Sequence, residues 1–344
     1  MTEFEEIGGY FELELPLGNE YHNNALRFNT ARNALSYFLL KNKITDLYIP
    51  VYICDKVVNT IKQGKTRIHF YHLDDNFSPL LSKDEIGDAY ILLVNYFGIC
   101  EKVINKCIKK FDNVICDNAQ AFFSNPESDV VTFYSPRKFF GVADGGYIYA
   151  NGLECENVVQ DDSTQRYMSR LVRIDGGFQA GNFLYRNSEQ LLNRAKIRRM
   201  SGLTQKILSS IHYDEAWEKR QENFHYLHKN LKKINLLKLN LRSVHGPMVY
   251  PLMIRQDGLR NFLIENKIYI PQYWPEVSFR THQGSFEYQL ANDMCPLPID
   301  QRYSKKEMNI ILELINKFLD KTQLPVSELP DEIEDKELVV NSSA

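Results

Sequence analysis

Strand-like and helix-like segments alternate along the first half of the chain, and this alternation constrains its fold more than any other feature. Short runs rich in β-branched and aromatic residues are expected to be strands: DLYIP, TRIHFYHL, AYILLVNYF, NVICD and DVVTFYS. Helix-like segments precede and separate these runs, and in residues 102–111 the apolar side chains share one helical stripe. The pattern predicts an α/β fold in which helices cover a mainly parallel sheet.

The second half of the chain has a different pattern, which predicts a smaller α+β domain. Residues from about 160 to 232 are charged and helix-rich, and the strand-like segments PMVYPLMI and NKIYIPQYW flank a helix-like segment. A last amphipathic helix is expected at 303–319. We expect an N-terminal arm at 1–25, a large domain at 26–210, a small C-terminal domain at 211–322 and an acidic, flexible tail at 323–344.

Charge and composition exclude several classes of function. The net charge of -3 gives no basic excess for nucleic-acid binding. No apolar run approaches the roughly 20 residues of a membrane helix, and the acidic start does not resemble a signal peptide. The cysteines and histidines lack metal-site spacing, and the cysteine pattern is typical of a reduced compartment. We therefore expect a cytoplasmic protein without a metal, a membrane or a nucleic acid as partner.

Two charged side chains lie in surroundings where charge is costly. Asp117 follows the strand-like run NVIC, which places it at the carboxyl end of a buried strand, where open α/β sheets bind ligands. Lys138 lies within the aromatic segment TFYSPRKFF. Partial desolvation there would lower the pKa of the lysine, as an amine nucleophile requires. The alternatives are an ordinary turn aspartate and a lysine whose stem lies along the aromatic rings while its ammonium stays in water.

Together the acid and the lysine suit pyridoxal phosphate. This cofactor needs a lysine for its covalent attachment and a carboxylate that keeps its pyridine nitrogen protonated, so that the ring accepts electrons. The sequence therefore indicates a pyridoxal phosphate enzyme with Lys138 and Asp117 as its catalytic residues.

The same residues resemble a known family. CDNAQAF followed by TFYSPRKFFGVADGGYIY resembles the Asp-x-Ala-Gln signature and lysine-containing loop of the DegT/DnrJ/EryC1/StrS aminotransferases. These are the sugar aminotransferase branch of the fold-type-I pyridoxal phosphate enzymes, and weaker similarity extends over most of residues 25 to 320. The resemblance implies the PLP-transferase fold type I, with a mainly parallel sheet in a large three-layer domain and a smaller C-terminal α+β domain.

The resemblance also implies roles for individual residues. Lys138 would hold the cofactor, Asp117 would pair with the pyridinium nitrogen, and Gln120 would contact the ring or its hydroxyl. The phosphate would lie at the amino end of a helix that begins near Ala31, a residue that replaces the family's glycine; free N–H groups there favour an anion. Further cofactor contacts are expected from Arg32, Asn33, Ser135 and, against the ring face, either Tyr52 or Cys54.

Arginines are concentrated between residues 166 and 199. They number seven, against one lysine: Arg166, Arg170, Arg173, Arg186, Arg194, Arg198 and Arg199. Arginine suits bidentate phosphate contact, so Arg166, Arg170 and Arg173 are candidates for binding a substrate diphosphate, although a charged helix surface is the plainer interpretation. The resemblance implies that this segment donates an asparagine, Asn182 or Asn187, to the cofactor phosphate of a partner subunit. We therefore expect a homodimer with shared active sites.

The function that the resemblance implies is amino-group transfer. An amino acid, with glutamate as the expected donor, would aminate a keto sugar carried by a nucleotide, as in polysaccharide biosynthesis. Three alternatives stay open. They are a dehydratase on the same fold, whose members replace the lysine with histidine, a transaminase of small keto acids, and a non-catalytic binding protein that kept the fold.

Overall fold

The protein contains one large and one small sheet, as seen in a computed structural model that describes residues 7–155, 157–255 and 257–321. The strands are β1 (Leu26–Phe28), β2 (Asp46–Pro50), β3 (Arg67–Tyr71), β4 (Tyr90–Val94), β5 (Val114–Asn118), β6 (Val131–Tyr134), β7 (Gly146–Tyr149), β8 (Val249–Met253) and β9 (Met294–Pro298). The α-helices are α1 (Ala31–Lys41), α2 (Asp55–Lys62), α3 (Lys83–Ile86), α4 (Glu101–Ile108), α5 (Met168–Asn193), α6 (Gly202–Ser209), α7 (Tyr213–Leu231), α8 (Leu259–Glu265), α9 (Phe286–Asp293) and α10 (Lys305–Lys321). Short 3-10 helices are η1 (Tyr96–Gly98), η2 (Pro136–Lys138), η3 (Thr164–Tyr167), η4 (Leu241–Ser243) and η5 (Pro275–Phe279).

The large sheet has seven strands in the order β1-β7-β6-β5-β4-β2-β3. Its strands from β3 to β6 pair in parallel, whereas β7 pairs antiparallel with both β6 and β1. Every residue of β5 is buried, as expected for a central strand with helices on both faces. The predicted mainly parallel sheet is confirmed. Parallel pairing places the carboxyl ends of β4, β5 and β6 at the same edge.

Helices pack on the large sheet through their apolar faces. In α1 the side chains of Leu35, Phe38 and Leu39 are buried, and α1 contacts β1, β6 and β7. Thr30 caps this helix, because its side chain accepts a hydrogen bond from the N–H of Asn33. The start of α1 is thereby fixed close to β7.

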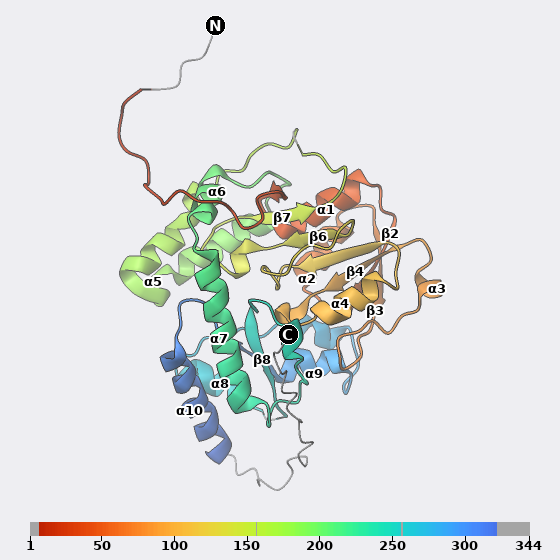
Figure 1. The fold of residues 1–344 in the computed structure, drawn as a ribbon, viewed down its shortest axis with the longest axis vertical. Helices are drawn as coiled ribbons and strands as arrows, with labels where there is room; N and C mark the ends of the chain where they lie inside the picture. Colours follow the sequence, from red (N-terminus) through yellow and green to blue (C-terminus); the bar gives the residue numbers. More distant parts are fainter. Residues whose placement is uncertain (1–6, 156, 256, 322–344) are drawn as a thin grey trace, which may run out of the picture.

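The second sheet differs from the sequence expectation. β8 lies within the predicted strand PMVYPLMI, but its antiparallel partner is β9, not NKIYIPQYW. The expectation of a strand at 266–274 is wrong, since the chain there is irregular. Figure 1 shows α7 running from the large sheet toward β8, with α10 beside its far end.

The division of the chain into domains at residue 210 remains a prediction, and the tail at 323–344 lies outside the described residues. Within the described ranges, no helix is both long and apolar enough to cross a membrane.

Candidate active site

A cavity of about 440 Å³ lies at the carboxyl edge of the large sheet. Val94 at the end of β4, Asp117 in β5 and Ser135 directly after β6 line one part of it, together with Lys138 of η2. Open α/β sheets bind their ligands at this edge. The structure therefore brings the predicted lysine and aspartate into one cavity.

Asp117 is a buried carboxylate at the base of the cavity. In the sheet it lies between Val94 of β4 and Phe133 of β6, and its Oδ1 accepts a hydrogen bond of 2.8 Å from the N–H of Ala119. Burial raises the pKa of the Asp117 carboxyl, whereas the charge of Lys138 and the Ala119 N–H lower it. Burial dominates and the pKa is raised, so a cation in the cavity would be needed to favour the carboxylate form of Asp117.

Lys138 projects into the same cavity from η2. Its side chain is open to the cavity, yet surrounding protein desolvates it and lowers the pKa of its amine, while Asp117 and Cys54 raise it. Its Nζ forms no hydrogen bond or ion pair with the residues that the structure describes. A desolvated amine without a fixed partner suits a nucleophile.

Gln120 lies beside Asp117 and also lines the cavity. Its Oε1 accepts a hydrogen bond of 2.8 Å from the N–H of Phe97, a residue in the left-handed region with φ of 58°. This bond fixes the amide at the turn that follows β5, which places Gln120 against whatever occupies the cavity.

The start of α1 forms the cationic end of the cavity. Thr30, Ala31 and Arg32 line it together with Ser135 and Arg137. Burial lowers the pKa of Arg32, and the neighbouring charge of Arg137 lowers it further. Two guanidinium groups and free helix N–H groups favour an anion such as a phosphate at this end.

Arg137 has one carboxylate neighbour, Glu189 of α5, with which it forms an ion pair. Its buried Nε has no hydrogen-bond partner among the described residues. A buried donor without a partner is costly, so an anion with several acceptor oxygens would complete this site. On this ground the residues present fit the phosphate of pyridoxal phosphate.

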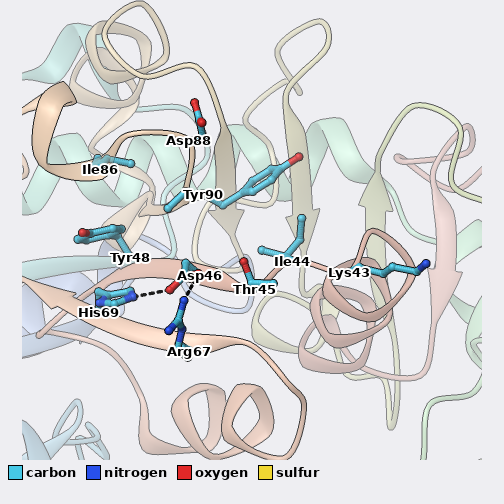
Figure 2. A pocket seen from close by; sticks show the side chains of 11 residues that line it. Lys43, Ile44, Thr45, Asp46, Tyr48, Arg67, His69, Ile86, Asp88 and Tyr90 are labelled. Atoms are coloured by element: carbon cyan, nitrogen blue, oxygen red, sulfur yellow. Dashed lines mark hydrogen bonds and ion pairs between the residues drawn. The ribbon is translucent and has the colours of Figure 1, made fainter.

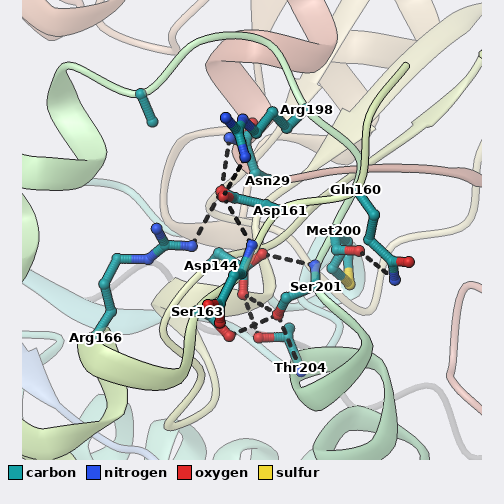
Figure 3. Close-up of polar contacts among 12 residues, drawn as sticks. Asn29, Asp144, Gln160, Asp161, Ser163, Arg166, Arg198, Met200, Ser201 and Thr204 are labelled. Atoms are coloured by element: carbon teal, nitrogen blue, oxygen red, sulfur yellow. Dashed lines mark hydrogen bonds and ion pairs between the residues drawn. The ribbon is translucent and has the colours of Figure 1, made fainter. Parts of the chain in front are cut away.

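The Asp-Gly-Gly turn after Lys138 packs directly under the start of α1. A Cβ on Gly146 would lie 2.2 Å from the backbone N of Ala31, so only glycine fits there. Asp144 is buried and accepts hydrogen bonds from the N–H and hydroxyl of Ser201 and from Thr204 (Figure 3). These contacts join the lysine loop to the start of α6.

Several predicted cofactor contacts lie outside the cavity of the single chain. Asn33 instead donates to Asn29 Oδ1 at 2.8 Å and to backbone carbonyls near α5. Tyr52 is fully buried against Trp274, with ring centroids 4.7 Å apart, whereas Cys54 lines the cavity. Of the two candidates for the ring face, Cys54 is thus the better placed. Asn187 is exposed on α5.

The arginines proposed for substrate binding also lie outside this cavity. Arg166 pairs with Asp161 at 3.0 Å, and Figure 3 shows that carboxylate also facing Asn29. Arg170 donates to the carbonyl of Val142 at 2.7 Å. Arg173 is exposed, and its guanidinium lies over the ring of Phe178. Arg166 and Arg170 therefore make contacts within the chain, whereas Arg173 is the exposed member of the three.

The cavity includes residues that the sequence analysis did not identify. They come from α5, α7 and the segments beside the second sheet: Tyr185, Glu189, Arg220, Tyr269, Tyr273, Trp274 and Asp300. The concentration of aromatic residues in IYIPQYWP is the sequence signal that could have indicated a ligand-binding segment. Arg220 and Glu189 carry no such signal, because ordinary helices also present charged residues at these spacings.

Arg220 fixes the lysine loop to the second sheet. The guanidinium is buried, donates to the carbonyls of Phe139, Pro247 and Met248 at 3.1–3.3 Å, and donates to Gln301 at 2.9 Å. Burial lowers its pKa to about 10. A planar cation with several donors is suited to hold such separate segments together.

A second hollow of about 480 Å³ lies at the opposite edge of the large sheet (Figure 2). Asp46 there accepts hydrogen bonds from Arg67 and His69, both at 2.8 Å, and these contacts hold the pKa of Asp46 well below its usual range. The Asp46 carboxylate is already paired. Among the described residues that line this hollow, there is no such combination as the desolvated Lys138 and buried Asp117 of the cavity at the carboxyl edge.

Comparison with known proteins gives a match in structure only. No protein-family model and no curated protein sequence matches the chain. Among solved structures, DesV from S. venezuelae superposes with a TM-score of 0.61 at 14% identity, covering 86% of this chain and 84% of its own. A DegT DnrJ EryC1 StrS aminotransferase from Brucella abortus gives 0.57 at 15% identity, covering 86% and 85%. Helicobacter pylori PseC, an aminotransferase of pseudoaminic acid biosynthesis, gives 0.57 at 14% identity, covering 86% and 87%.

These similarities establish the fold. The chain has the fold of the DegT-type sugar aminotransferases, which is fold type I of the pyridoxal phosphate enzymes, and the predicted fold class is confirmed. The resemblance seen in the sequence is thus confirmed at the level of the fold.

Proposed function

We propose that the protein is a pyridoxal phosphate-dependent aminotransferase that moves an amino group from an amino acid, with glutamate as donor, onto a nucleotide-linked keto sugar. The observation that carries this proposal is the pairing of Lys138 and Asp117 in one cavity at the carboxyl edge of the sheet. The fold supports it, since several solved structures with this fold are described as sugar aminotransferases.

Different residues of the cavity would contact different parts of the cofactor. The start of α1 at Thr30 and Ala31, with Arg32, Ser135 and Arg137, would bind the phosphate. Gln120 would contact the ring edge and Cys54 one ring face. When bound, pyridoxal phosphate supplies an electron-accepting ring and a carbon that links to amines.

Two residues would move or hold protons. The Asp117 carboxylate would hold a proton on the ring nitrogen, because an opposite charge in a desolvated site stabilises both ions. Lys138 would attach the cofactor through Nζ. Once displaced by the donor, its amine would move a proton from the donor carbon to the cofactor carbon that links to amines. The lowered pKa of Lys138 favours the neutral form that this step needs.

The acceptor and the oligomeric state are further parts of the proposal. Asn187 and Arg173 are exposed on α5, so in a homodimer with shared active sites they would be free to reach the partner subunit's cavity. There Asn187 would contact the cofactor phosphate, and Arg173 would contact the diphosphate of the sugar nucleotide. The enzyme would act in the cytoplasm.

A spectroscopic titration tests the proposed reaction. Purified protein loaded with pyridoxal phosphate is expected to be yellow, and adding glutamate without an acceptor is expected to move the absorption to shorter wavelength as the amino group is taken up. Retention of the yellow form with every amino acid offered would contradict transamination. A protein that takes up no cofactor would instead support a non-catalytic binding role on the same fold.

A further inference from the structure

Glu189 of α5 places a carboxylate at the cationic end of the cavity. It forms an ion pair with Arg137, and the side chains of Glu189 and Arg137 are 22% and 14% exposed. The other carboxylates among the described residues that line the cavity are Asp117 and Asp300, and Asp300 pairs with Arg302 at 2.6 Å. Glu189 therefore brings a negative charge to the place where the cofactor phosphate is proposed to bind.

Two further arginines lie close to this ion pair. Burial lowers the pKa of Arg32 and of Arg170, and the charge of Arg137 lowers both further. The charge of Glu189 raises the pKa of both arginines. Arg137 thus repels two neighbouring guanidinium groups, and Glu189 offsets part of that repulsion. A cluster of partly buried cations without any anion would be costly.

The second half of α5, which contains Glu189, contacts the cavity at both of its ends. At its start the ring of Phe178 stacks on Tyr269, which lines the cavity, with ring centroids 4.6 Å apart. At its end the Oδ1 of Asn193 accepts a hydrogen bond of 3.2 Å from Arg32. These contacts keep the Glu189 carboxylate at the cavity.

Arg137 has more donors than Glu189 uses. Its Nη2 pairs with the carboxylate, but its buried Nε has no hydrogen-bond partner among the described residues. A phosphate has more acceptor oxygens than a carboxylate, so it can fill such donors together with the N–H groups at the start of α1. In a partly desolvated cavity a carboxylate would repel a phosphate bound beside it. Glu189 and a phosphate are therefore competitors for Arg137.

We propose that Glu189 is an internal counter-ion of the phosphate end of the cavity, and that its carboxylate leaves Arg137 when a phosphate binds there. In the cofactor-free protein Glu189 would neutralise the arginines, and its displacement would set the affinity for ligands that carry a phosphate. Glu189 is thus a positioning residue for cofactor uptake and takes no part in the chemistry.

This role is compatible with the dimer of the proposed function. Asn187 precedes Glu189 by two positions, which places it about 200° around the helix. A movement of the Glu189 side chain toward or away from the cavity therefore leaves Asn187 free on the other side of α5. The inference rests on the proposed function for the identity of the ligand, whereas a test with inorganic phosphate does not depend on the proposed chemistry.

Titration with inorganic phosphate, pyridoxal phosphate and pyridoxal measures the competition. Glu189→Gln removes the charge and keeps the size of the side chain, so both phosphate-bearing ligands should bind about 10-fold more tightly, which corresponds to about 1.4 kcal/mol. Pyridoxal, which lacks the phosphate, should bind the variant and the wild type equally. The matched control is Asp175→Asn, which removes the charge of an exposed carboxylate of α5 that does not line the cavity. The control should keep the wild-type affinities.

A double-mutant cycle tests whether Arg137 is the shared partner. In an Arg137→Gln background, adding Glu189→Gln should change the affinity for pyridoxal phosphate by less than about twofold, because the competition requires the guanidinium. Unchanged or weaker phosphate binding in Glu189→Gln, an equal gain for pyridoxal, or an undiminished gain in the Arg137→Gln background would overturn the inference. With normal cofactor uptake these results would leave the proposed function standing, whereas a protein that binds inorganic phosphate but takes up no pyridoxal phosphate would count against that function alone.

Discussion

At the scale of single residues, Asp117 is the proposed catalytic residue besides Lys138. Asp117→Asn keeps the size of the side chain but removes the charge that would hold a proton on the ring nitrogen. We expect the variant still to take up pyridoxal phosphate, while the half-reaction with glutamate slows by roughly 100-fold or more, as when one preorganised charge is lost from a transition state. Single-turnover absorbance measurements would show this, and a near-normal rate would remove Asp117 from the catalytic role.

His22 gives a second residue-scale prediction, which concerns pH. Its imidazole is buried, with Nε2 2.8 Å from the Phe122 carbonyl oxygen and Nδ1 3.1 Å from the Tyr149 hydroxyl, and burial lowers its pKa to about 4. Between that value and about 6.5, the unfolded chain binds a proton that the folded chain does not. The stabilisation is therefore complete above about pH 6.5 and is lost as the pH falls toward 4.

We expect this proton to lower the free energy of unfolding by roughly 2 kcal/mol between pH 7 and pH 5. Urea unfolding of the wild type and of His22→Gln at both pH values measures it. The variant should be less stable at pH 7 but should lose less stability on acidification. If both proteins lost the same free energy of unfolding between pH 7 and pH 5, groups other than His22 would account for the loss of stability in acid.

The sequence indicated which residues share the cavity where a strand end fixes the side chain, while the roles of these residues stay predictions. Asp117, Gln120 and Lys138 all reach the cavity, because a strand terminus and the turn after it leave few directions for their side chains. Asn33 and Arg166 do not line the cavity. Their hydrogen-bond partners are far away in sequence, at 195–196 and at Asp161, and nothing local indicates them.

At the scale of elements, the turn at residues 144–146 contacts the start of α1. Adding one methyl group at Gly146 tests this contact. Gly146→Ala would place a Cβ 2.2 Å from Ala31 N, so α1 must shift. We expect a loss of roughly 1–3 kcal/mol in stability, as overpacking typically costs, and a weaker affinity for pyridoxal phosphate because the phosphate end of the cavity moves.

The matched control for this change is Gly141→Ala, where a Cβ would meet no atom within 4 Å. Urea unfolding and cofactor titration of both variants separate packing from binding. A Gly146→Ala protein with wild-type stability and affinity would show that the turn does not position α1.

Element-scale prediction also succeeded in part. The parallel strands were found because their residues are buried on both faces and read as apolar runs. β9 was missed, and NKIYIPQYW was taken for a strand in its place. Both segments are apolar and contain proline, so the choice of the partner for β8 depends on non-local packing that composition does not record.

At the scale of the whole molecule, the cavity joins the edge of the large sheet to segments beside the small sheet. Arg32, Arg137 and Lys138 line the cavity from α1 and η2 beside the large sheet, whereas Tyr269, Tyr273 and Trp274 line it from the segment between α8 and η5. Because these cations would hold the cofactor, the aromatic side chains remain to contact an uncharged ring of the acceptor, and Arg173 from a partner subunit would contact its diphosphate.

We therefore expect a nucleotide-linked keto sugar to react at least roughly 100-fold faster than the free keto sugar. Two charge-assisted contacts to the diphosphate, at about 1.5 kcal/mol each, account for that factor. Comparison of kcat/KM for the two acceptors measures it. Equal values would point to a transaminase of small keto acids.

A single arginine tests the same expectation. Arg173→Gln should raise KM for the sugar nucleotide and leave the glutamate half-reaction unchanged, since the guanidinium of Arg173 is exposed on α5. Arg242→Gln, an exposed arginine in η4, is the control and should change neither quantity. An unchanged KM in the Arg173 variant would assign the diphosphate contact to other residues.

The central claim is that Lys138 attaches the cofactor, and reductive trapping tests it most directly. Protein loaded with pyridoxal phosphate is reduced with borohydride, digested and mapped by mass spectrometry, alongside Lys138→Ala and the control Lys56→Ala, which removes another lysine that lines the cavity. The account predicts the reduced cofactor on Lys138 in the wild type and in the Lys56 variant, and its loss from a folded Lys138 variant. Recovery of the label on another lysine of the wild type, or equal labelling of the Lys138 variant, would contradict the account.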